Sequence, residues 1–457
     1  MKQNEILTII VVSIGLSVIM MDTSMVAIAL PSINEKIYTY NLSIQWIINI
    51  VILTIATFGI VAGKISDIYG VKKLVATGLT VFLSGSLGCF FSNNFIFLLF
   101  FRAIQGTAIV LLSSPLIKLI NEVFSPSKIS HALGLTFGIA STVFIIAPVI
   151  SGQIIKYFEW NYIFLVSVPI TIVGIWCVNK IQLKCDAKVN NDMNYYSFIL
   201  LSLGLFTLTF SFMEGSDYQW ASPFIVTLMF VSLASLVLFI MVERYSETSL
   251  INYKIFSNKK YSIAVIISMM SYTQSISVIF WIMYMQNSLG FTPTSTALLM
   301  VPFYTLISIG SFLSGLLIRK QGVYKTLNIA AFIAFFGFIL TYFFLPDKTY
   351  YSILPIILCC GISSPLFTNA TRYIAINSAK KETTGIHIGA LGNFRQISGT
   401  ISLAIFTSIV NNNTRNTVLT SDVLFYNGFH IIILTCVYTS FIILILSTII
   451  NIKKNKH

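Results

Sequence analysis

Charge is scarce in this sequence. Asp, Glu, Lys and Arg together account for 9% of the 457 residues, whereas an ordinary soluble domain carries roughly 25%. Hydrophobic residues reach 56%. So little charge excludes an ordinary water-soluble domain, and the composition predicts a protein that lies in a lipid bilayer.

Cysteine and histidine are also rare, with six and four residues. The cysteines lack the spacing of metal ligands and are typical of small buried residues, so we expect no metal site. The sequence has no Gly-rich phosphate-binding loop followed by Lys and Ser or Thr, which excludes an ATPase domain of that type in this chain. We expect no cofactor, no catalytic residues and no enzymatic activity.

Long apolar runs are abundant. A helix needs about 20 apolar residues to cross a hydrocarbon core of about 30 Å, and fourteen such runs lie between charged, Pro or Asn-rich segments. The first run is too long for a signal peptide and lacks a small-residue cleavage site, so we interpret it as a retained helix. The runs are Ile6–Leu30, Ile44–Gly63, Leu74–Phe91, Phe95–Ile117, Ala132–Ile155, Tyr162–Val178, Tyr196–Met213, Pro223–Val242, Ser262–Met285, Thr296–Ile318, Thr326–Leu345, Tyr351–Ile374, Thr384–Val410 and Phe429–Asn451.

The net charge of +13 is distributed unevenly. If the amino terminus is cytoplasmic, the loops and tails on that side hold about 22 of the 28 Lys and Arg residues, as the positive-inside rule describes. We therefore expect both termini in the cytoplasm and no role in nucleic-acid binding. Two cations, Arg102 and Arg395, fall inside apolar runs.

Two basic loops resemble each other, "GKISDIYGVKKL" at 63–74 and "GLLIRKQGVYKTL" at 315–327. Four matched pairs share one offset of 252 residues, namely Gly63 with Gly315, Gly70 with Gly322, Val71 with Val323, and Lys73 with Lys325. Parallel repeats of this kind build the two lobes of some transporters. We predict a six-helix lobe at 1–184, two inserted helices at 185–258 and a second six-helix lobe at 259–457. Chance similarity of two short loops is the alternative.

Several short motifs stand out along the chain. They are "DTSMVAIALP" from Asp22, the loop with Gly63, Asp67, Gly70, Lys72 and Lys73, "RAIQG" from Arg102, "FEWNYIFLVSVP" from Phe158, and "NFRQISG" from Asn393. With them the chain resembles the major facilitator superfamily, and within it the fourteen-helix drug:proton antiporters of Gram-positive bacteria. The resemblance implies a multi-pass protein of the bacterial cytoplasmic membrane that exchanges protons for small-molecule drugs. We expect it to be a monomer.

The fifth apolar run departs from the antiporter motif. That motif has a Gly-Pro pair followed by Gly-Gly, whereas this chain has "APVISG", which keeps Pro148 and Gly152 but has Ala147 and Ser151 at the other two positions. Because the motif is associated with export, the departure leaves the direction of transport open. A permease for a physiological solute or lipid is therefore an alternative, as is a membrane scaffold or sensor that transports nothing.

Asp22 and Arg102 lie at a similar predicted depth below the outer face. A charge at the centre of a membrane helix costs on the order of 2.5 to 3.5 kcal/mol, so such residues usually face the bundle interior and have partners. Two interpretations remain open. The residues form a permanent ion pair, or Asp22 binds and releases a proton under the influence of Arg102.

Two other charged residues have less certain surroundings. Glu214, at the end of the seventh run, is a second protonation or cation-attracting site if it faces inward, and a solvated loop residue if the helix ends earlier. We expect Arg395 to bond backbone carbonyls, Asn393 or Asn369, or to contact a substrate or lipid head group.

The remaining candidates concern conformation and substrate. Asp67 near the end of the second run is a candidate latch between lobes, because a carboxylate there can bind backbone N–H groups or a basic residue. Large aromatic and Met side chains suit a permissive site for flat hydrophobic molecules. The candidates of this type are Met21, Trp46, Trp281, Tyr284 and Phe303. Together these features predict a proton-coupled exporter of lipophilic cationic or zwitterionic drugs.

Overall fold

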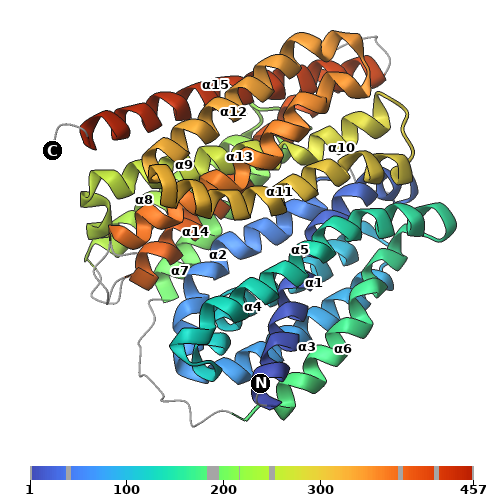
Figure 1. The fold of residues 1–457 in the computed structure, drawn as a ribbon. Coiled ribbons are helices and arrows are strands. Elements are labelled where there is room, and N and C mark those ends of the chain that lie inside the picture. The colour runs from blue at the N-terminus through green and yellow to red at the C-terminus, as the bar shows by residue number, and fades with distance from the viewer. Residues whose placement is uncertain are drawn as a thin grey trace. The chain divides into compact units, whose positions relative to one another are not determined.

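The structure is a computed structural model that describes residues 3–37, 43–182, 195–215, 217–245, 253–378, 384–415 and 421–454. At 60–69 and at some other helical positions it describes the backbone alone. Every regular element in the described ranges is a helix (Figure 1). The predicted all-α class is therefore confirmed for this part of the chain.

The chain divides into two units. Unit 1 comprises Met1–Met193 and Pro293–Leu298, and unit 2 comprises Asn194–Thr292 and Leu299–His457. The helices of unit 1 are α1 (Gln3–Lys36), α2 (Trp46–Tyr69), α3 (Val71–Phe90), α4 (Phe95–Val123), α5 (Pro126–Tyr157), the 3-10 helix η1 (Trp160–Val166) and α6 (Ser167–Lys180).

Unit 2 contains the remaining elements, including the two helices predicted as an insertion. The elements that lie wholly in unit 2 are α7 (Tyr195–Glu214), α8 (Pro223–Tyr245), η2 (Tyr253–Ser257), α9 (Lys259–Ile276), α10 (Val278–Asn287), α12 (Val323–Phe344), η3 (Leu345–Asp347), α13 (Tyr350–Asn377), α14 (Thr384–Arg415) and α15 (Ser421–Lys454). Helix α11 (Pro293–Gln321) begins in unit 1 and continues in unit 2. The predicted three-part division of the chain stays a prediction.

Twelve spans in the described residues are long and apolar enough to cross a membrane. They correspond to all predicted runs except the second and the thirteenth. Helices α2 and α14 occupy those two regions, but the described apolar part of α2, Trp46–Gly59, is shorter than a full span. Fourteen crossings and cytoplasmic termini therefore remain predictions.

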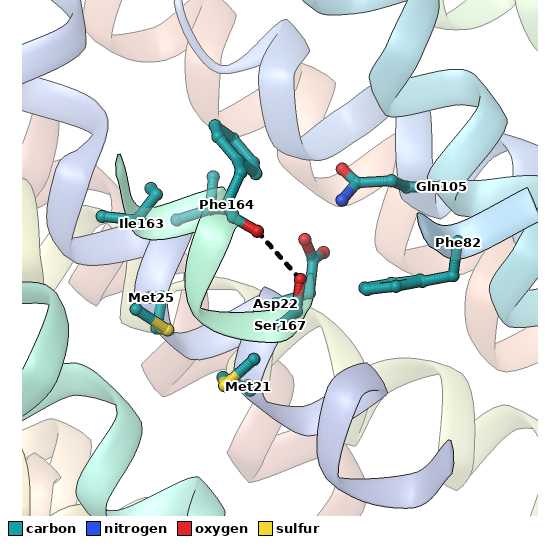
Figure 2. Close-up of a pocket in the computed structure, with 9 residues that line it drawn as sticks. Met21, Asp22, Met25, Phe82, Gln105, Ile163, Phe164 and Ser167 are labelled. Carbon is teal, nitrogen blue, oxygen red and sulfur yellow. Dashed lines mark hydrogen bonds between the residues drawn. The ribbon is translucent and has the colours of Figure 1, made fainter. Parts of the chain in front are cut away.

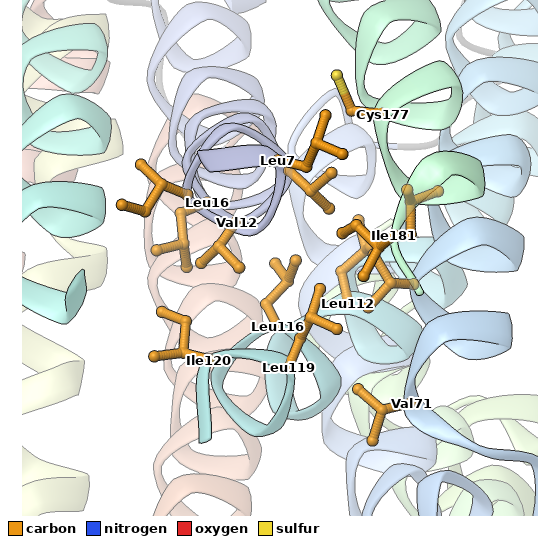
Figure 3. Packing of buried hydrophobic residues seen from close by; sticks show 14 of the residues in the cluster. Leu7, Val12, Leu16, Val71, Leu112, Leu116, Leu119, Ile120, Cys177 and Ile181 are labelled. Atoms are coloured by element: carbon orange, nitrogen blue, oxygen red, sulfur yellow. The ribbon is translucent and has the colours of Figure 1, made fainter. Parts of the chain in front are cut away.

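The core of unit 1 forms where α1, α3, α4, α5 and α6 pack together. Figure 3 shows Leu7, Val12 and Leu16 of α1 beside Leu112, Leu116 and Leu119 of α4. On α4 these positions follow a spacing of three and four residues, which places them on one face. That packing fixes α1 against α4, the two helices that carry Asp22 and Arg102.

The predicted ninth run is interrupted in the structure. It forms α9 and α10, which meet at Ser277 instead of continuing as one regular helix. The Ser277 hydroxyl donates to the Gln274 carbonyl at 2.6 Å, and the Ser275 hydroxyl donates to the Ser271 carbonyl at 3.2 Å. Serine hydroxyls that bond to the preceding turn compete with the helix and bend it, which gives a physical reason for the break.

The two repeated loops share an unusual backbone conformation. Gly70, between α2 and α3, has φ 85° and ψ 143°, and Gly322, between α11 and α12, has φ 88° and ψ 161°. Side chains make this region of φ and ψ unfavourable, so glycine is needed at both turns. The same geometry at both positions supports the internal repeat predicted from the loops.

Candidate functional site

Asp22 and Arg102 meet inside unit 1. Nη1 of Arg102 lies 2.5 Å from Oδ1 of Asp22, and the two residues are 1% and 7% exposed. Nε of the same guanidinium donates to the Ile47 carbonyl of α2 at 3.0 Å, so Arg102 links three helices. The contact joins the two charges that were predicted to lie at a similar depth below the outer face of the membrane.

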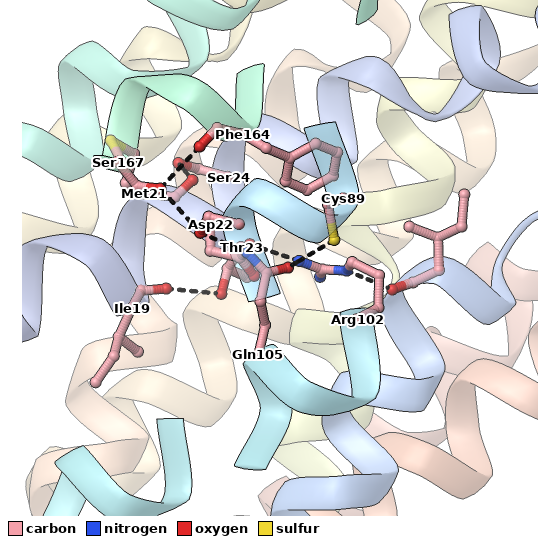
Figure 4. Close-up of polar contacts among 12 residues, drawn as sticks. Ile19, Met21, Asp22, Thr23, Ser24, Cys89, Arg102, Gln105, Phe164 and Ser167 are labelled. Carbon is pink, nitrogen blue, oxygen red and sulfur yellow. Dashed lines mark hydrogen bonds and ion pairs between the residues drawn. The ribbon is translucent and has the colours of Figure 1, made fainter. Parts of the chain in front are cut away.

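Gln105 is the centre of the surrounding polar network (Figure 4). Its Oε1 accepts from Arg102 Nη1 at 2.8 Å and from the Cys89 thiol at 3.4 Å. Its Nε2 donates to Ser86 at 3.0 Å, and Ser86 in turn accepts from Ser167 at 3.1 Å. The amide thereby connects α4 with α3 and α6.

Gln105 was not predicted as a site residue, although a signal was present. Gln105 lies three residues after Arg102 in the "RAIQG" motif, and residues at this spacing are neighbours on a helix. Ser86 and Ser167 gave no comparable signal, because isolated serines are common in membrane helices and only the packing of α3 and α6 brings these two together.

One oxygen of the Asp22 carboxylate has no hydrogen-bond partner among the described residues. This atom is Oδ2, which is buried like the rest of the side chain. Asp22 lines a small cavity together with Gln105 and Phe164, and the cavity has room for about one water molecule. Figure 2 shows Met21 and Met25 from α1 on one side of it, and Gln105 and Phe82 on another.

The helix-five motif makes two contacts within unit 1. The Ser151 hydroxyl donates to the Met25 carbonyl of α1 at 2.9 Å, so the serine that departs from the family pattern has a structural partner. The Gly152 carbonyl accepts from the Thr294 hydroxyl at 2.7 Å. A Cβ added at Gly152 would lie 2.8 Å from Thr294 Cα, so glycine permits the close approach. Pro148 lies inside α5.

The predicted conformational loop is described only in part. Gly63 and Asp67 belong to α2, but their side chains lie outside the described ones, so the latch stays a prediction. Lys73 is exposed. Lys72 has a role that the sequence did not suggest, because its Nζ donates to the Asn179 and Ile181 carbonyls at 3.0 and 2.6 Å. It thereby satisfies carbonyls at the end of α6.

Glu214 is the last residue of α7 and is fully buried in unit 2. The helix therefore does not end a turn earlier, and Glu214 is not the solvated loop residue that the alternative interpretation required. Its proposed part in proton or cation binding stays a prediction.

The aromatic substrate candidates are buried in helix packing. Trp281 and Tyr284 of α10 are fully buried, and Phe303 and Trp46 are 5% and 3% exposed. The Trp281 ring lies edge-on to Phe303 with centroids 5.5 Å apart. In this structure these side chains fill space between helices, and their role in substrate binding stays a prediction. Met21 is buried beside Asp22 and lines the small cavity.

Arg395 has partners that differ from the expected asparagines. Its Nη1 donates to the Thr368 hydroxyl at 2.8 Å, and its guanidinium carbon lies 4.6 Å from the centre of the Tyr272 ring. Asn369 bonds instead to Ser314 at 2.6 Å. The sequence therefore located a cation that needs a partner, but not the residues around it.

The sequence of this chain is similar to those of known proteins. The family model described as Major Facilitator Superfamily matches residues 12–403. Multidrug resistance protein Stp of Mycobacterium tuberculosis (strain CDC 1551 / Oshkosh) is 24% identical over 422 residues, which are 90% of this chain and 76% of that protein. Multidrug transporter protein MdtP of Bacillus subtilis (strain 168) is 25% identical over 425 residues, 91% and 76% of the two chains.

A solved structure supports the fold. The crystal structure of a POT family transporter in complex with 5-aminolevulinic acid has a TM-score of 0.68 to this chain at 12% identity. The similarity covers 97% of this chain and 96% of that one. Such a low identity informs about the fold alone. The family match and the twelve apolar spans found among the described residues indicate a multi-pass membrane protein.

Proposed function

This chain belongs to the major facilitator superfamily, and from that membership we propose that it is a proton-coupled antiporter that exports lipophilic cationic or zwitterionic drugs by alternating access. The two relatives named for multidrug resistance and multidrug transport support drugs as the cargo. We place the protein as a monomer in the bacterial cytoplasmic membrane, powered by the proton gradient without a cofactor.

One observation carries the proton-coupling part of the proposal. The Asp22 carboxylate has one oxygen on Arg102 and the other, Oδ2, without a described partner. Burial of an unpaired carboxylate oxygen is costly. A proton on that oxygen neutralises the group and reduces the cost of burying it, and a cavity large enough for about one water molecule, a possible partner for the O–H group, lies beside it.

The network around Arg102 is suited to a pair that breaks and re-forms. If Asp22 is protonated, the Arg102 guanidinium keeps its bonds to the Gln105 amide and the Ile47 carbonyl. The buried cation is then still hydrogen-bonded, so the cost of neutralising its counter-ion is reduced.

The energy of the proton gradient is adequate for this task. One proton that moves inward across 100 mV supplies about 2.3 kcal/mol, enough for a roughly fiftyfold gradient of a neutral substrate at one-to-one exchange. The transport step needs no bond chemistry.

The test is uptake of a lipophilic cationic dye into inverted membrane vesicles with an acidic lumen, with and without an uncoupler. We expect uptake by the wild type, collapse of the dye gradient with the uncoupler, and no active uptake by Asp22→Asn, because the amide keeps the shape and loses the titratable group. Glu5→Gln is the matched control, since Glu5 lies on the same helix and pairs with Lys128 at 3.1 Å, away from the Asp22 network.

Four outcomes would contradict the proposal. Full active accumulation by Asp22→Asn would remove the proton-carrier role of Asp22. Equal loss in Glu5→Gln would attribute the defect to a general loss of charge on α1. Dye movement in the opposite direction, or movement independent of the proton gradient, would favour the permease alternative.

A further inference from the structure

Arg395 is a cation inside α14. Among the residues whose side chains the structure describes, no carboxylate forms an ion pair with it. Its side chain is partly buried. A cation within a membrane protein normally pairs with an acid or contacts a substrate pathway, so the missing counter-ion of Arg395 needs an explanation.

The residues that the structure describes use only a small part of the hydrogen-bonding capacity of Arg395. A guanidinium has five N–H donors in a fixed planar fork, and the described structure uses one, in the Nη1 bond to Thr368. Arg102 differs, because it donates to Asp22, Gln105 and the Ile47 carbonyl. The remaining donors of Arg395 match the two oxygens of a carboxylate or phosphate group.

The guanidinium is held in place before any ligand binds. It stacks on the Tyr272 ring at 4.6 Å, and the Tyr272 hydroxyl is fixed by a bond of 3.2 Å to Gln396 Oε1. The Thr368 hydroxyl accepts from Arg395 and donates to the Ser364 carbonyl at 3.0 Å. A preorganised fork loses less conformational entropy when it binds an anion.

The helices around Arg395 carry polar groups that also suit a ligand with an anionic group. Helices α9, α13 and α14 pack against one another in unit 2. Thr273 and Ser402 share a hydrogen bond of 2.7 Å between α9 and α14, and Ser275 and Ser364 share one of 3.2 Å between α9 and α13.

We propose that Arg395, stacked on Tyr272 and bonded to Thr368, is a binding subsite for the anionic group, a carboxylate or phosphate, of the transported molecule. The inference rests on the proposed function and assigns this subsite to those transported amphiphiles that carry an anionic group, among them zwitterionic drugs. A lipid head group has the same chemistry, and the experiment separates it from a transported substrate.

The experiment compares two dyes that differ at one group. Rhodamine 110 carries a free carboxylate, and rhodamine 123 is its methyl ester. For Arg395→Gln we expect KM for transport of rhodamine 110 to rise about tenfold to hundredfold, the range for loss of a charge-assisted hydrogen bond. We expect KM for rhodamine 123 to change by less than about twofold, because its ester has no negative charge to pair with the guanidinium. Arg395→Lys should retain part of the preference, since it keeps the charge but not the planar fork.

Arg244→Gln is the matched control, because Arg244 is exposed in the last turn of α8 and lies outside the subsite. Equal changes of both KM values in Arg395→Gln would overturn the proposal, as would an equal effect in Arg244→Gln. Thermal unfolding of each variant checks that it is folded. If Arg395→Gln does not fold, the dye preference of Arg395→Lys decides the question.

A binding measurement separates this proposal from the proposed function. Fluorescence anisotropy of the two dyes with purified protein needs no proton gradient, so binding of rhodamine 110 that depends on Arg395 supports the subsite even if vesicles show no transport. For the lipid source, native mass spectrometry follows retained phosphatidylglycerol. If Arg395→Gln loses the bound lipid and keeps the wild-type dye preference, the subsite serves a lipid and the substrate assignment is overturned.

Discussion

The contact between Gly152 and Thr294 yields a sharp prediction for Gly152→Ala. The new Cβ would lie 2.8 Å from Thr294 Cα and 3.0 Å from the Pro293 carbonyl oxygen. The first distance is about 0.6 Å short of ordinary van der Waals separation. Because these atoms belong to the backbone, no side chain can rotate away. The segment Pro293–Leu298 must therefore move away from α5.

The magnitude follows from two opposing terms. Replacing Gly by Ala within a helix is favourable by roughly 0.5–1 kcal/mol, and overpacking of a close contact costs about 1–3 kcal/mol. Gly138→Ala on the same helix measures the first term alone, because nothing lies within 4 Å of a Cβ at that position. The difference between the two variants should be about 1–3 kcal/mol in disfavour of Gly152→Ala.

The assay is amide hydrogen exchange of the peptide that contains Pro293–Leu298, followed by mass spectrometry. Local opening free energies set exchange rates, so we expect exchange in Gly152→Ala to be roughly fivefold to 150-fold faster than in Gly138→Ala. Equal protection of this segment in the two variants would refute the reasoning. Faster exchange throughout α5 and α11 would indicate general destabilisation instead.

Two further predictions concern buried polar residues. Gln105→Leu should lower stability by about 1.5–3 kcal/mol, because Arg102 loses a charged hydrogen bond; thermal unfolding in detergent measures this, and a Tm equal to that of the wild type would contradict the network. Glu214→Gln should reduce export of cationic dyes more than export of uncharged dyes, because a buried carboxylate favours the binding of a cation beside it. Efflux of a matched dye set tests this, and equal losses for the two classes would reject a substrate-selective role for Glu214.

The fold was predictable where one physical rule dominated. Long apolar runs located the helices because lipid demands uninterrupted hydrophobic segments, and Gly70 and Gly322 marked the repeat because their backbone conformation tolerates few other residues. The interruption at Ser277 was not predicted. It depends on hydroxyl bonds to the preceding turn, and these leave no mark in a hydropathy pattern.

The site was predictable only at positions where burying a residue carries a large free-energy cost. Asp22, Arg102 and Arg395 were identifiable because a charge in an apolar run is expensive. Their neutral partners were not identified. Gln105 had a signal in its spacing from Arg102, whereas Thr368 and Tyr272 had none, since residues of these types occur throughout the chain and their role depends on which helices pack together.

Lys72 serves two purposes that are usually treated separately. In the predicted orientation it belongs to the cytoplasmic cations that direct insertion of the chain, and in the folded protein its ammonium group binds carbonyls at the end of α6. Neutralising this lysine to alter membrane topology would therefore also release the end of a neighbouring helix. Charge-swap experiments on such loops would then report biogenesis and tertiary anchoring together, and a Lys72→Arg variant, which preserves the topological signal, would separate them.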